Sequence, residues 1–593
     1  MSRRVMTVVV TLCCAVAAEA QTTAPSVPGD STAPARSLAG LWKAERRFGP
    51  DARGTLIIKR AGSAYTADMM GRTLPVRVKS GELAFELPDS QGGFRGGLPS
   101  RGTLTGHWFP PGSSALLVGF RFASPVTLKA DGPNRWRGQI VPFDDEFTFH
   151  LLLRGRPDGT LHVLLRNPER DFGAQIGAER LVRNGDVVWL MGRRRGQGEE
   201  QELAKGSYDA ETDVLTLAFP SRGGSYDFRR DREDSDFYPR GLHPDRYVYR
   251  PPPALADGWP TGTLAAVRID RAAIEKIIDT IVSMPMDSID APQIHGLLLA
   301  RHGKLVLEEY FHRQHRDRLH ETRSAAKSMT ATLVGAAMQS GAPLALSTPV
   351  YRLMNGGTFP PGLDPRRRAM ALEHLLTMSS GYFCDDRNDD APGNENTMLE
   401  QTKEPDYYRY TLAVPMAAAP GTESVYCSAN PNLALGMLGR ATGESPLTTF
   451  DRLLGVPMRI RNYGWPLDPA GNPYGGGSTQ FLPRDFMKFG QLMLNGGTWN
   501  SRRILGRDFV ARASSTLVRI GARGYGYLWW GVDYPLRGRT IHAYSALGAG
   551  GQLVMVVPEL DLVIASYGGS YSSQGWKYLQ QDLIPRLVLP AVH

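Results

Sequence analysis

A serine and a lysine three residues apart offer the clearest chemistry in this sequence. Ser324 and Lys327 stand between Arg323 and Thr330, where an apolar pattern with helical spacing begins. Because residues i and i+3 share one face of a helix, the two side chains can touch. A lysine amine beside a serine hydroxyl can activate that hydroxyl as a nucleophile. The spacing therefore predicts a nucleophilic serine, with Lys327 as its general base or the partner of that base.

A tyrosine further along the chain is the second candidate group. Tyr426 opens the run Tyr426-Cys427-Ser428, shortly after Pro420-Gly421-Thr422. A phenol has a pKa of about 10, too high for a base at neutral pH, but a neighbouring ammonium favours its ionised form. Tyr426 could then take the serine proton and return it to the leaving group. The alternative is a buried tyrosine whose hydroxyl is satisfied by the fold.

A glycine-rich stretch from Ala546 to Gln552 supplies the third candidate. Acyl transfer needs backbone N–H groups aimed at the developing oxyanion. Glycines at a strand start let backbone come close to a ligand, so Gly548 and Ala549 are predicted to form this wall, together with the N–H of Ser324. The alternative is a β-bulge or a strand corner.

The first residues predict export. Met1 to Leu12 combines a basic start with an apolar run, and Ala18-Glu19-Ala20 is a small-x-small cleavage signal, so residues 1–20 are interpreted as a signal peptide. The apolar run is too short for a stable membrane span, and no later stretch predicts one. We therefore expect a periplasmic or secreted protein without an integral membrane span.

Two cysteines remain after such a cleavage, Cys384 and Cys427. In an oxidising compartment a pair is expected to be bridged, with two buried free thiols as the alternative. A bridge would hold the loop that begins at Cys384 beside Tyr426, because Cys427 directly follows that tyrosine.

Several domains must position these groups, because 593 residues are too many for one core. Residues 21–37 are rich in Thr, Ser, Pro and Ala and predict a disordered linker. Residues 38–235 show period-2 alternation, as at Leu83, Phe85 and Leu87, and frequent turn signals. They predict an all-β sandwich or barrel, with two repeats if the pattern from about Ser124 copies the first half. Residues 236–262, rich in proline, predict a stiff connector.

Residues 263–593 change to an α/β pattern. Helical spacing from Asp270 is followed by a hairpin around Gly303, the serine helix and a mostly helical middle. Two strands, 552–557 and 562–566, and a final amphipathic helix end the chain. The pattern predicts an antiparallel sheet flanked by helices, with a helical insert.

With the three stretches in order, residues 262 to 593 resemble the serine β-lactamase-like hydrolases. That superfamily includes class C β-lactamases, penicillin-binding peptidases, family VIII esterases and 6-aminohexanoate-oligomer hydrolases. The marks are the runs that hold Ser324 and Lys327, His374 to Gly381, Pro420-Gly421-Thr422, Pro483-Arg484-Asp485, and Gly548 to Gln552 ahead of Pro558-Glu559. The resemblance implies an acyl-enzyme on Ser324, with Lys327 and Tyr426 as acid/base groups and no cofactor.

Two departures bear on the substrate. The tyrosine motif usually ends in Asn, but here Ser428 takes that place and is assigned to the substrate wall. The third motif usually carries Lys or His two residues before its glycine, and here Ala546 stands there. A cation for a substrate carboxylate is thus missing, so the pattern favours an ester or amide substrate over a β-lactam or a D-alanyl-D-alanine peptide. Trp529 and Trp530 could line an apolar pocket, or belong to the core.

Other partners and sites are less well supported. The net charge of +9 comes mostly from scattered residues, and the tightest arginine runs predict solvated loops rather than a nucleic-acid site. His312, His315 and His320 match no common zinc spacing and predict an exposed polar loop. The aspartates of residues 385–390 lack the pattern of a calcium loop and predict a solvated acidic loop. The alternative from another class is a non-catalytic protein whose β-rich part binds surface ligands, and the oligomeric state is left open.

Overall fold

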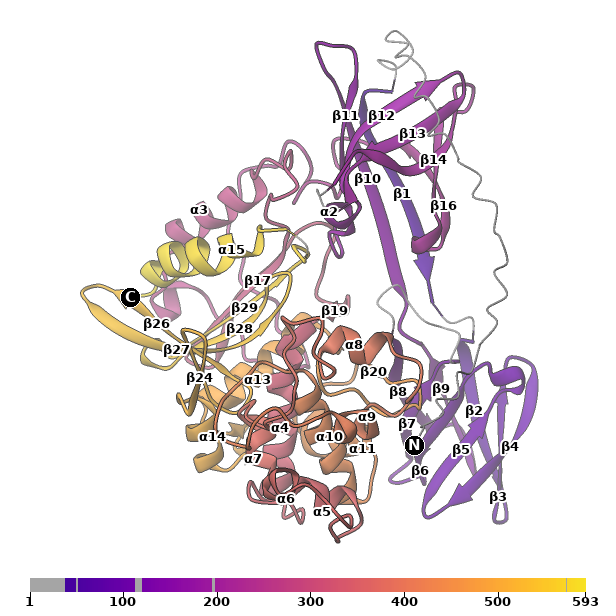
Figure 1. Cartoon of the computed structure of the whole chain (residues 1–593), viewed down its shortest axis with the longest axis vertical. Coiled ribbons are helices and arrows are strands. Elements are labelled where there is room, and N and C mark those ends of the chain that lie inside the picture. Colours follow the sequence, from indigo (N-terminus) through magenta and orange to yellow (C-terminus); the bar gives the residue numbers. More distant parts are fainter. Residues whose placement is uncertain (1–37, 50–51, 112–119, 195–197, 572) are drawn as a thin grey trace, which may run out of the picture.

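The computed structural model describes residues 38–49, 52–111, 120–194, 198–571 and 573–593. The predicted signal peptide and linker therefore lie outside the described residues. The rest of the chain forms an all-β N-terminal part and an α/β C-terminal part, as predicted (Figure 1). None of the helices in the described ranges has the length and apolar character needed to cross a membrane.

The N-terminal region consists of two interleaved β units. The first runs from β2 to β9 and closes because β9 pairs with both β2 and β8. The second is a closed barrel, in which β1 pairs with β10 along its length and with β16. The first unit comprises β2 (Gly54–Ala61), β3 (Ala64–Met69), β4 (Arg72–Lys79), β5 (Glu82–Glu86), β6 (Gly93–Gly97), β7 (Thr103–Phe109), β8 (Arg121–Ala130) and β9 (Arg135–Ile140). The barrel comprises β1 (Gly40–Phe48), β10 (Asp145–Gly155), β11 (Leu161–Arg166), β12 (Ala178–Asn184), β13 (Val187–Gly192), β14 (Gln201–Asp209), β15 (Val214–Phe219) and β16 (Gly224–Arg230).

Each β unit has its own apolar core. The alternating residues that predicted strands point inward, with Leu83 and Phe85 in the first core and Leu215 and Leu217 in the second. Period-2 patterning fills the interior of a small barrel with side chains and leaves the other face to solvent. The units are interleaved in sequence, because β1 comes before the first unit but belongs to the barrel.

The C-terminal domain is built on an antiparallel sheet of eight strands, in the order β18-β17-β29-β28-β27-β26-β25-β24. The predicted hairpin and the two predicted late strands are confirmed, while β24, β25, β26 and β27 were not anticipated. The strands are β17 (Ile294–Arg301), β18 (Lys304–Tyr310), β24 (Val518–Ile520), β25 (Arg523–Tyr525), β26 (Trp530–Leu536), β27 (Arg539–Gly548), β28 (Gln552–Val557) and β29 (Leu562–Gly568).

Helices cover both faces of this sheet. The terminal helices α3 (Arg271–Val282) and η8 (Leu579–Val588) pack on one face through a core of aliphatic side chains. The serine helix α4 (Ala326–Gln339) and α13 (Pro483–Leu494) pack on the other, with the helical insert beyond them. Almost every residue of α4 is buried, which is expected for a helix that is apolar on all sides. The predicted α/β arrangement is therefore confirmed.

The helical insert is made mostly of short helices. They are α5 (Val350–Met354), α6 (Pro365–Ala369), α7 (Leu372–Leu376), α8 (Glu395–Glu400), α9 (Tyr407–Ala413), α10 (Ala429–Thr442), α11 (Pro446–Phe450), η6 (Asp451–Gly455) and α12 (Val456–Met458), and α14 (Arg507–Ala513) follows α13.

Candidate active site

Ser324 lies in a tight turn at the entrance to α4. The turn η5 (Arg323–Ala325) leads directly into the helix, which places Lys327 in the first helical turn. Lys327 Nζ donates a hydrogen bond to Ser324 Oγ over 2.8 Å. Lys327 is buried and Ser324 is half-buried. The contact predicted from the i, i+3 spacing is therefore present.

The backbone of this turn is held in an unusual conformation. Arg323 has a φ of 48°, the left-handed region that a side chain normally avoids. Its carbonyl accepts a hydrogen bond from Ser478 N over 3.1 Å, and Thr322 Oγ1 donates to Thr479 O over 2.7 Å. Such strain, on the order of 1–3 kcal/mol, persists only where the surroundings fix the backbone.

Tyr426 completes the cluster. Its ring centroid lies 5.0 Å from Lys327 Nζ, and the two side chains are close enough to hydrogen bond. The ring also stacks on Trp530, with centroids 5.5 Å apart and an interplanar angle of 29°. The structure thus brings together Ser324, Lys327 and Tyr426, as the sequence predicted.

Lys327 is charged at neutral pH. Burial by itself would lower its pKa, but the interactions with Tyr426 and with the carboxylates of Glu395 and Asp386 outweigh burial and raise the pKa above its usual value. An ammonium has no free electron pair, so it cannot accept the serine proton, although it can stabilise negative charge beside it.

Asp386 is a site residue that sequence reasoning missed. Its Oδ2 accepts hydrogen bonds from both the backbone N and the Oγ of Ser428, over 2.8 and 2.6 Å. Its own backbone N donates to Tyr426 O over 3.0 Å. The prediction of a solvated acidic loop is therefore wrong for Asp386, whose side chain turns inward to Ser428, although Asp389 and Asp390 of the same loop are exposed.

The same contacts correct the role assigned to Ser428. The residue is fully buried, and its hydroxyl is committed to Asp386, so it does not form a surface that a substrate could touch. A carboxylate from another loop now stands behind the motif position that is usually Asn.

A disulfide explains how this loop is held. Cys384 and Cys427 are bridged, with their Cα atoms 5.6 Å apart, as the sequence predicted. The bridge ties the start of the acidic loop to the residue after Tyr426. It was also the sequence signal that could have identified Asp386, which stands two residues after Cys384.

A second carboxylate lies behind the first. Burial and the negative charge of Glu395 raise the pKa of Asp386 to about 6, although Lys327 acts in the opposite direction. Glu395, the first residue of α8, accepts a hydrogen bond from Tyr474 Oη over 2.6 Å. The negative charges of both carboxylates favour the ammonium form of Lys327.

The predicted oxyanion strand lies against the nucleophile turn. Gly548 ends β27, and a Cβ added there would lie only 2.4 Å from Thr322 O, so a side chain has no room. Ala549 follows and is exposed. Gly550 and Gly551 then turn the chain with φ values of 85° and 104°, which glycine adopts at little cost. The assignment of the second oxyanion N–H to Ala549 stays a prediction.

The two tryptophans have different roles. Trp529 is only 1% exposed and packs edge-on against Tyr544, so of the two roles considered for it the core role is confirmed and the pocket role is not. Trp530 is half-buried between Tyr426 and Tyr525, at the edge of the cluster.

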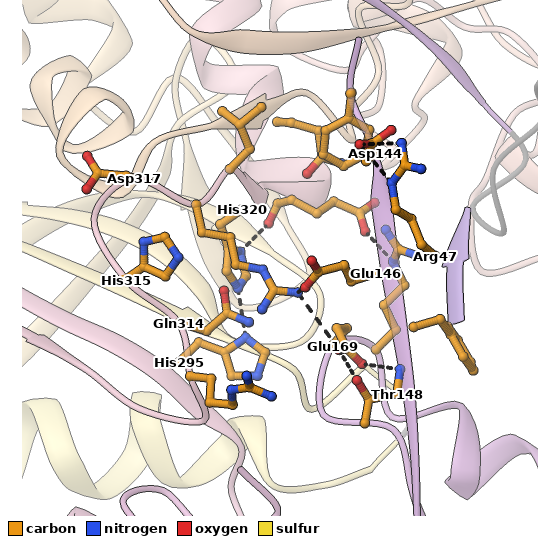
Figure 2. A pocket seen from close by; sticks show the side chains of 18 of the residues that line it. Arg47, Asp144, Glu146, Thr148, Glu169, His295, Gln314, His315, Asp317 and His320 are labelled. Atoms are coloured by element: carbon orange, nitrogen blue, oxygen red, sulfur yellow. Dashed lines mark hydrogen bonds and ion pairs between the residues drawn. The ribbon is translucent and has the colours of Figure 1, made fainter. Parts of the chain in front are cut away.

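A cavity of about 850 Å³ lies between the β region and the C-terminal domain (Figure 2). Its walls carry many charged side chains from both parts of the chain. Ser324, Lys327 and Tyr426 are not among the described residues that line this cavity. Figure 2 shows His295 and His320 directed toward one another, with Nδ1 of His295 2.8 Å from Nε2 of His320.

The histidines correct another expectation. His312 and His320 are buried rather than part of an exposed loop, and only His315 is exposed. Burial lowers the pKa of His312 and of His320 to about 4. Burial also lowers the pKa of His295, and the neighbouring His320 lowers it further. These side chains are neutral at pH 7.

One cluster in the barrel has the composition of a metal site. His150, Asp231 and Asp236 place ligand atoms within 4.8 Å of one another. However, Lys43 Nζ already lies 2.7 Å from Asp236 Oδ1, and the two carboxylates raise the pKa of His150 despite its burial. The cluster is therefore better described as a buried ion-pair network between His150, Lys43 and the two aspartates.

Comparison with known proteins gives the C-terminal domain its family. Residues 286–568 match the family model described as Beta-lactamase. This part of the chain carries a Beta-lactamase domain. A search of curated proteins finds no match.

Solved structures of low similarity were also found. They include a proposed 6-aminohexanoate-dimer hydrolase from Bacillus anthracis, at 19% identity and a TM-score of 0.41, covering 49% of this chain and 78% of that chain. EstCE1, a hydrolase with promiscuous acyltransferase activity, matches at 18% identity and a TM-score of 0.39, and the match covers 52% of this chain and 98% of that chain. A penicillin-binding protein homologue from Caulobacter crescentus matches at 13% identity and a TM-score of 0.39, covering 52% and 95%.

Proposed function

We propose that this protein is an exported serine hydrolase that cleaves an ester or amide through an acyl-enzyme on Ser324. The observation that carries the proposal is the 2.8 Å hydrogen bond from Lys327 to Ser324 Oγ, with Tyr426 against the same ammonium. A hydroxyl held beside a cation and a proton acceptor is the arrangement that nucleophilic catalysis requires.

Tyr426 is the proton acceptor in this mechanism. As a tyrosinate it takes the Ser324 proton while Oγ bonds to the carbonyl carbon, and the carbonyl oxygen becomes an oxyanion. The backbone N–H groups of Ser324 and Ala549 donate to that oxyanion. Tyr426 then protonates the leaving alcohol or amine as its bond to carbon breaks. A water molecule then attacks the acyl-enzyme, with Tyr426 again as the base, and this second step releases the acid and restores Ser324.

Lys327 keeps its proton throughout. Its charge stabilises the tyrosinate and the negative charge that develops on Oγ. Asp386 and Glu395 favour the ammonium form, so they support the reaction without touching the reacting atoms.

The surrounding charges favour a substrate without a free carboxylate. Ala546 is buried and apolar at the position where the resembling enzymes carry a cation. Asp386 and Glu395 add negative charge nearby, which would repel an anionic substrate. Both observations support a neutral ester or amide over a β-lactam or a peptide C-terminus.

The disulfide supports export. Structural disulfides persist in oxidising compartments and are rare in reducing ones. The bridge between Cys384 and Cys427 thus agrees with the leader-like sequence of residues 1–20, and we propose a periplasmic or secreted location.

A fluorophosphonate probe tests the proposal directly. We expect the wild-type protein to be labelled and to hydrolyse p-nitrophenyl butyrate, and Ser324→Ala to do neither. Absence of both activities in the folded wild type would favour a non-catalytic binding protein. Nitrocefin turnover as fast as ester turnover would instead favour a β-lactamase or a D-alanyl-D-alanine peptidase.

A further inference from the structure

A buried carboxylate lies three residues before Ser324. Glu321 is 5% exposed, and its two oxygens lie 3.1 Å from Nε of Arg170 and 3.2 Å from Nε of Arg323. Arg170 is equally buried and comes from the N-terminal barrel, in the loop between β11 and α2 (Phe172–Ile176). Since an unpaired buried charge is costly, Arg170 and Glu321 hold each other in place across the domain boundary.

The barrel fixes the loop that carries Arg170. Asn167 Oδ1 accepts from Arg170 N over 2.9 Å, and Asn167 Nδ2 donates to Thr148 O on β10 over 2.9 Å. The loop also fits tightly against the C-terminal sheet, because a Cβ at Gly569 would lie 2.1 Å from Pro168 O. Arg170 is therefore presented by a rigid support.

The Arg323 side chain extends the cluster to the oxyanion side. Its guanidinium lies over the ring of Tyr571, 4.7 Å from the centroid. Tyr571 accepts a hydrogen bond from Gln552 Nε2 over 3.1 Å, and its ring packs against Gly550. Glu321 thereby links the barrel to the residue before the nucleophile and to the turn after β27.

A strand ladder makes a second, independent connection. Glu321 belongs to β19 (His320–Glu321), which pairs with β21 (Gln480–Phe481). β21 pairs with β20 (Tyr463–Leu467), and β20 pairs with β8 of the first β unit, Trp465 opposite Ala123. Hydrogen-bonded backbone therefore runs from the N-terminal region to the residues just before the nucleophile turn.

We propose that the N-terminal β region supports the active site directly, with Arg170 and Glu321 as positioning residues for Ser324. This inference rests on the proposed function of Ser324. Arg323 has a positive φ, so the turn would relax if its anchors were removed. A displacement of about 1 Å in a nucleophile can lower a rate by about 100-fold.

The test compares Arg170→Met, which keeps bulk and removes charge, with the conservative Arg170→Lys and with Glu321→Gln. The matched control is Arg313→Gln, which breaks a different pair across the same boundary, between Arg313 and Glu45 at 3.1 Å. Each full-length variant is measured for its rate of fluorophosphonate labelling, for kcat and KM on p-nitrophenyl butyrate, for Tm, and for hydrogen exchange in the peptide of residues 318–328.

We expect Arg170→Met and Glu321→Gln to label about 10- to 100-fold more slowly, with the loss in kcat rather than KM and with faster exchange in that peptide. Arg170→Lys should recover part of the rate, and Arg313→Gln should match the wild type. Because both residues act on one turn, the double variant Arg170→Met/Glu321→Gln should be no slower than Glu321→Gln alone.

Unchanged labelling and exchange in Arg170→Met and Glu321→Gln would overturn the inference. Labelling of the wild type in the same experiment would still support the proposed serine hydrolase function. If the wild type were not labelled, the proposed function would fail, and the exchange measurement would still decide whether Arg170 orders the turn. An equal loss of labelling rate in Arg313→Gln would mean that any weakening of the contact between the domains slows the reaction, and it would also overturn the inference.

Discussion

Two groups of buried basic side chains in this molecule have opposite charge states. Lys327, beside the nucleophile, has a raised pKa and is charged, whereas His312 and His320, at the domain boundary, have pKa values lowered to about 4 and are neutral. All three are almost completely removed from solvent. Depth of burial therefore does not decide the direction in which the pKa of each group shifts from its usual value.

The difference comes from the neighbours. The charges of Asp386 and Glu395 raise the pKa of Lys327, while at His320 burial outweighs the effect of Glu321 and Arg318 lowers the pKa further. His150 supports the same rule, because it is as buried as the other histidines and yet Asp231 and Asp236 raise its pKa. A base in a protein interior is charged when partner carboxylates outweigh the cost of desolvation.

Removing the charged lysine should produce the largest effect. Lys327→Met takes away the cation that stabilises both Tyr426 and the developing charge on Ser324, so we expect kcat/KM for an ester to fall by at least about 1,000-fold. The control is Lys488→Met, which removes another buried lysine, paired with Asp485 away from the site. It should lower Tm but leave kcat/KM within about threefold. Substantial ester turnover by Lys327→Met would contradict the assigned role.

Neutralising its partner should have the next largest effect. Asp386→Asn weakens the hold on the Lys327 charge, and we expect kcat to fall about 10- to 100-fold. Because the pKa of Asp386 is raised to about 6, the wild type should lose activity as the pH falls below 6, and the variant should not show that limb.

The stability of Asp386→Asn should not fall together with its activity. A carboxyl whose pKa is raised on folding contributes stability below its unfolded pKa and loses it as the pH rises through about 6. Asp386→Asn should therefore keep or increase the denaturation midpoint at pH 7 while activity falls. A parallel loss of stability and activity would show that Asp386 is only a packing residue.

The neutral histidines predict an acid-sensitive boundary. A histidine whose pKa falls from 6.5 to about 4 on folding stabilises the fold at neutral pH, and this contribution is lost as the pH drops through that interval. The full loss is about 3 kcal/mol for each group. Urea unfolding at pH 7 and pH 5 should show a smaller decrease for His320→Gln than for the wild type.

His150 provides the opposite control for that measurement. Its raised pKa contributes stability at low pH that is lost as the pH rises through the folded pKa, so His150→Gln should make the acid decrease steeper. Identical pH dependence in both variants and the wild type would remove the distinction between the two kinds of buried histidine.

Opening the disulfide should give the smallest effect on catalysis. Without the bridge, the loop that carries Asp386 is free to move away from Tyr426, and we expect kcat/KM to fall about tenfold on reduction. The double variant Cys384→Ser/Cys427→Ser should show the lower activity with or without reductant. Full activity in that variant would mean that Ser428 and the surrounding core are sufficient to hold Asp386.

Local spacing was enough to predict much of this protein. The contact between Ser324 and Lys327 follows from helix geometry, because three residues separate them. Alternation at Leu83 and Phe85 predicted strands, since one face of such strands must be buried. The bridge between Cys384 and Cys427 was predicted from the two cysteines that would remain after removal of the predicted signal peptide.

Only the tertiary structure decided which distant groups surround the nucleophile. Arg170 comes from another domain, and Asp386 lies on a loop that is connected to Ser428 only through the disulfide, so residue spacing along the chain predicts neither contact. The same limit explains why Trp529 and the histidines were misplaced, since periodicity gives the face of a side chain but not the surface that covers it. Sequence determined the contact between Ser324 and Lys327, because its geometry is local. Packing determined their charge and support, because those depend on neighbours brought together by the fold.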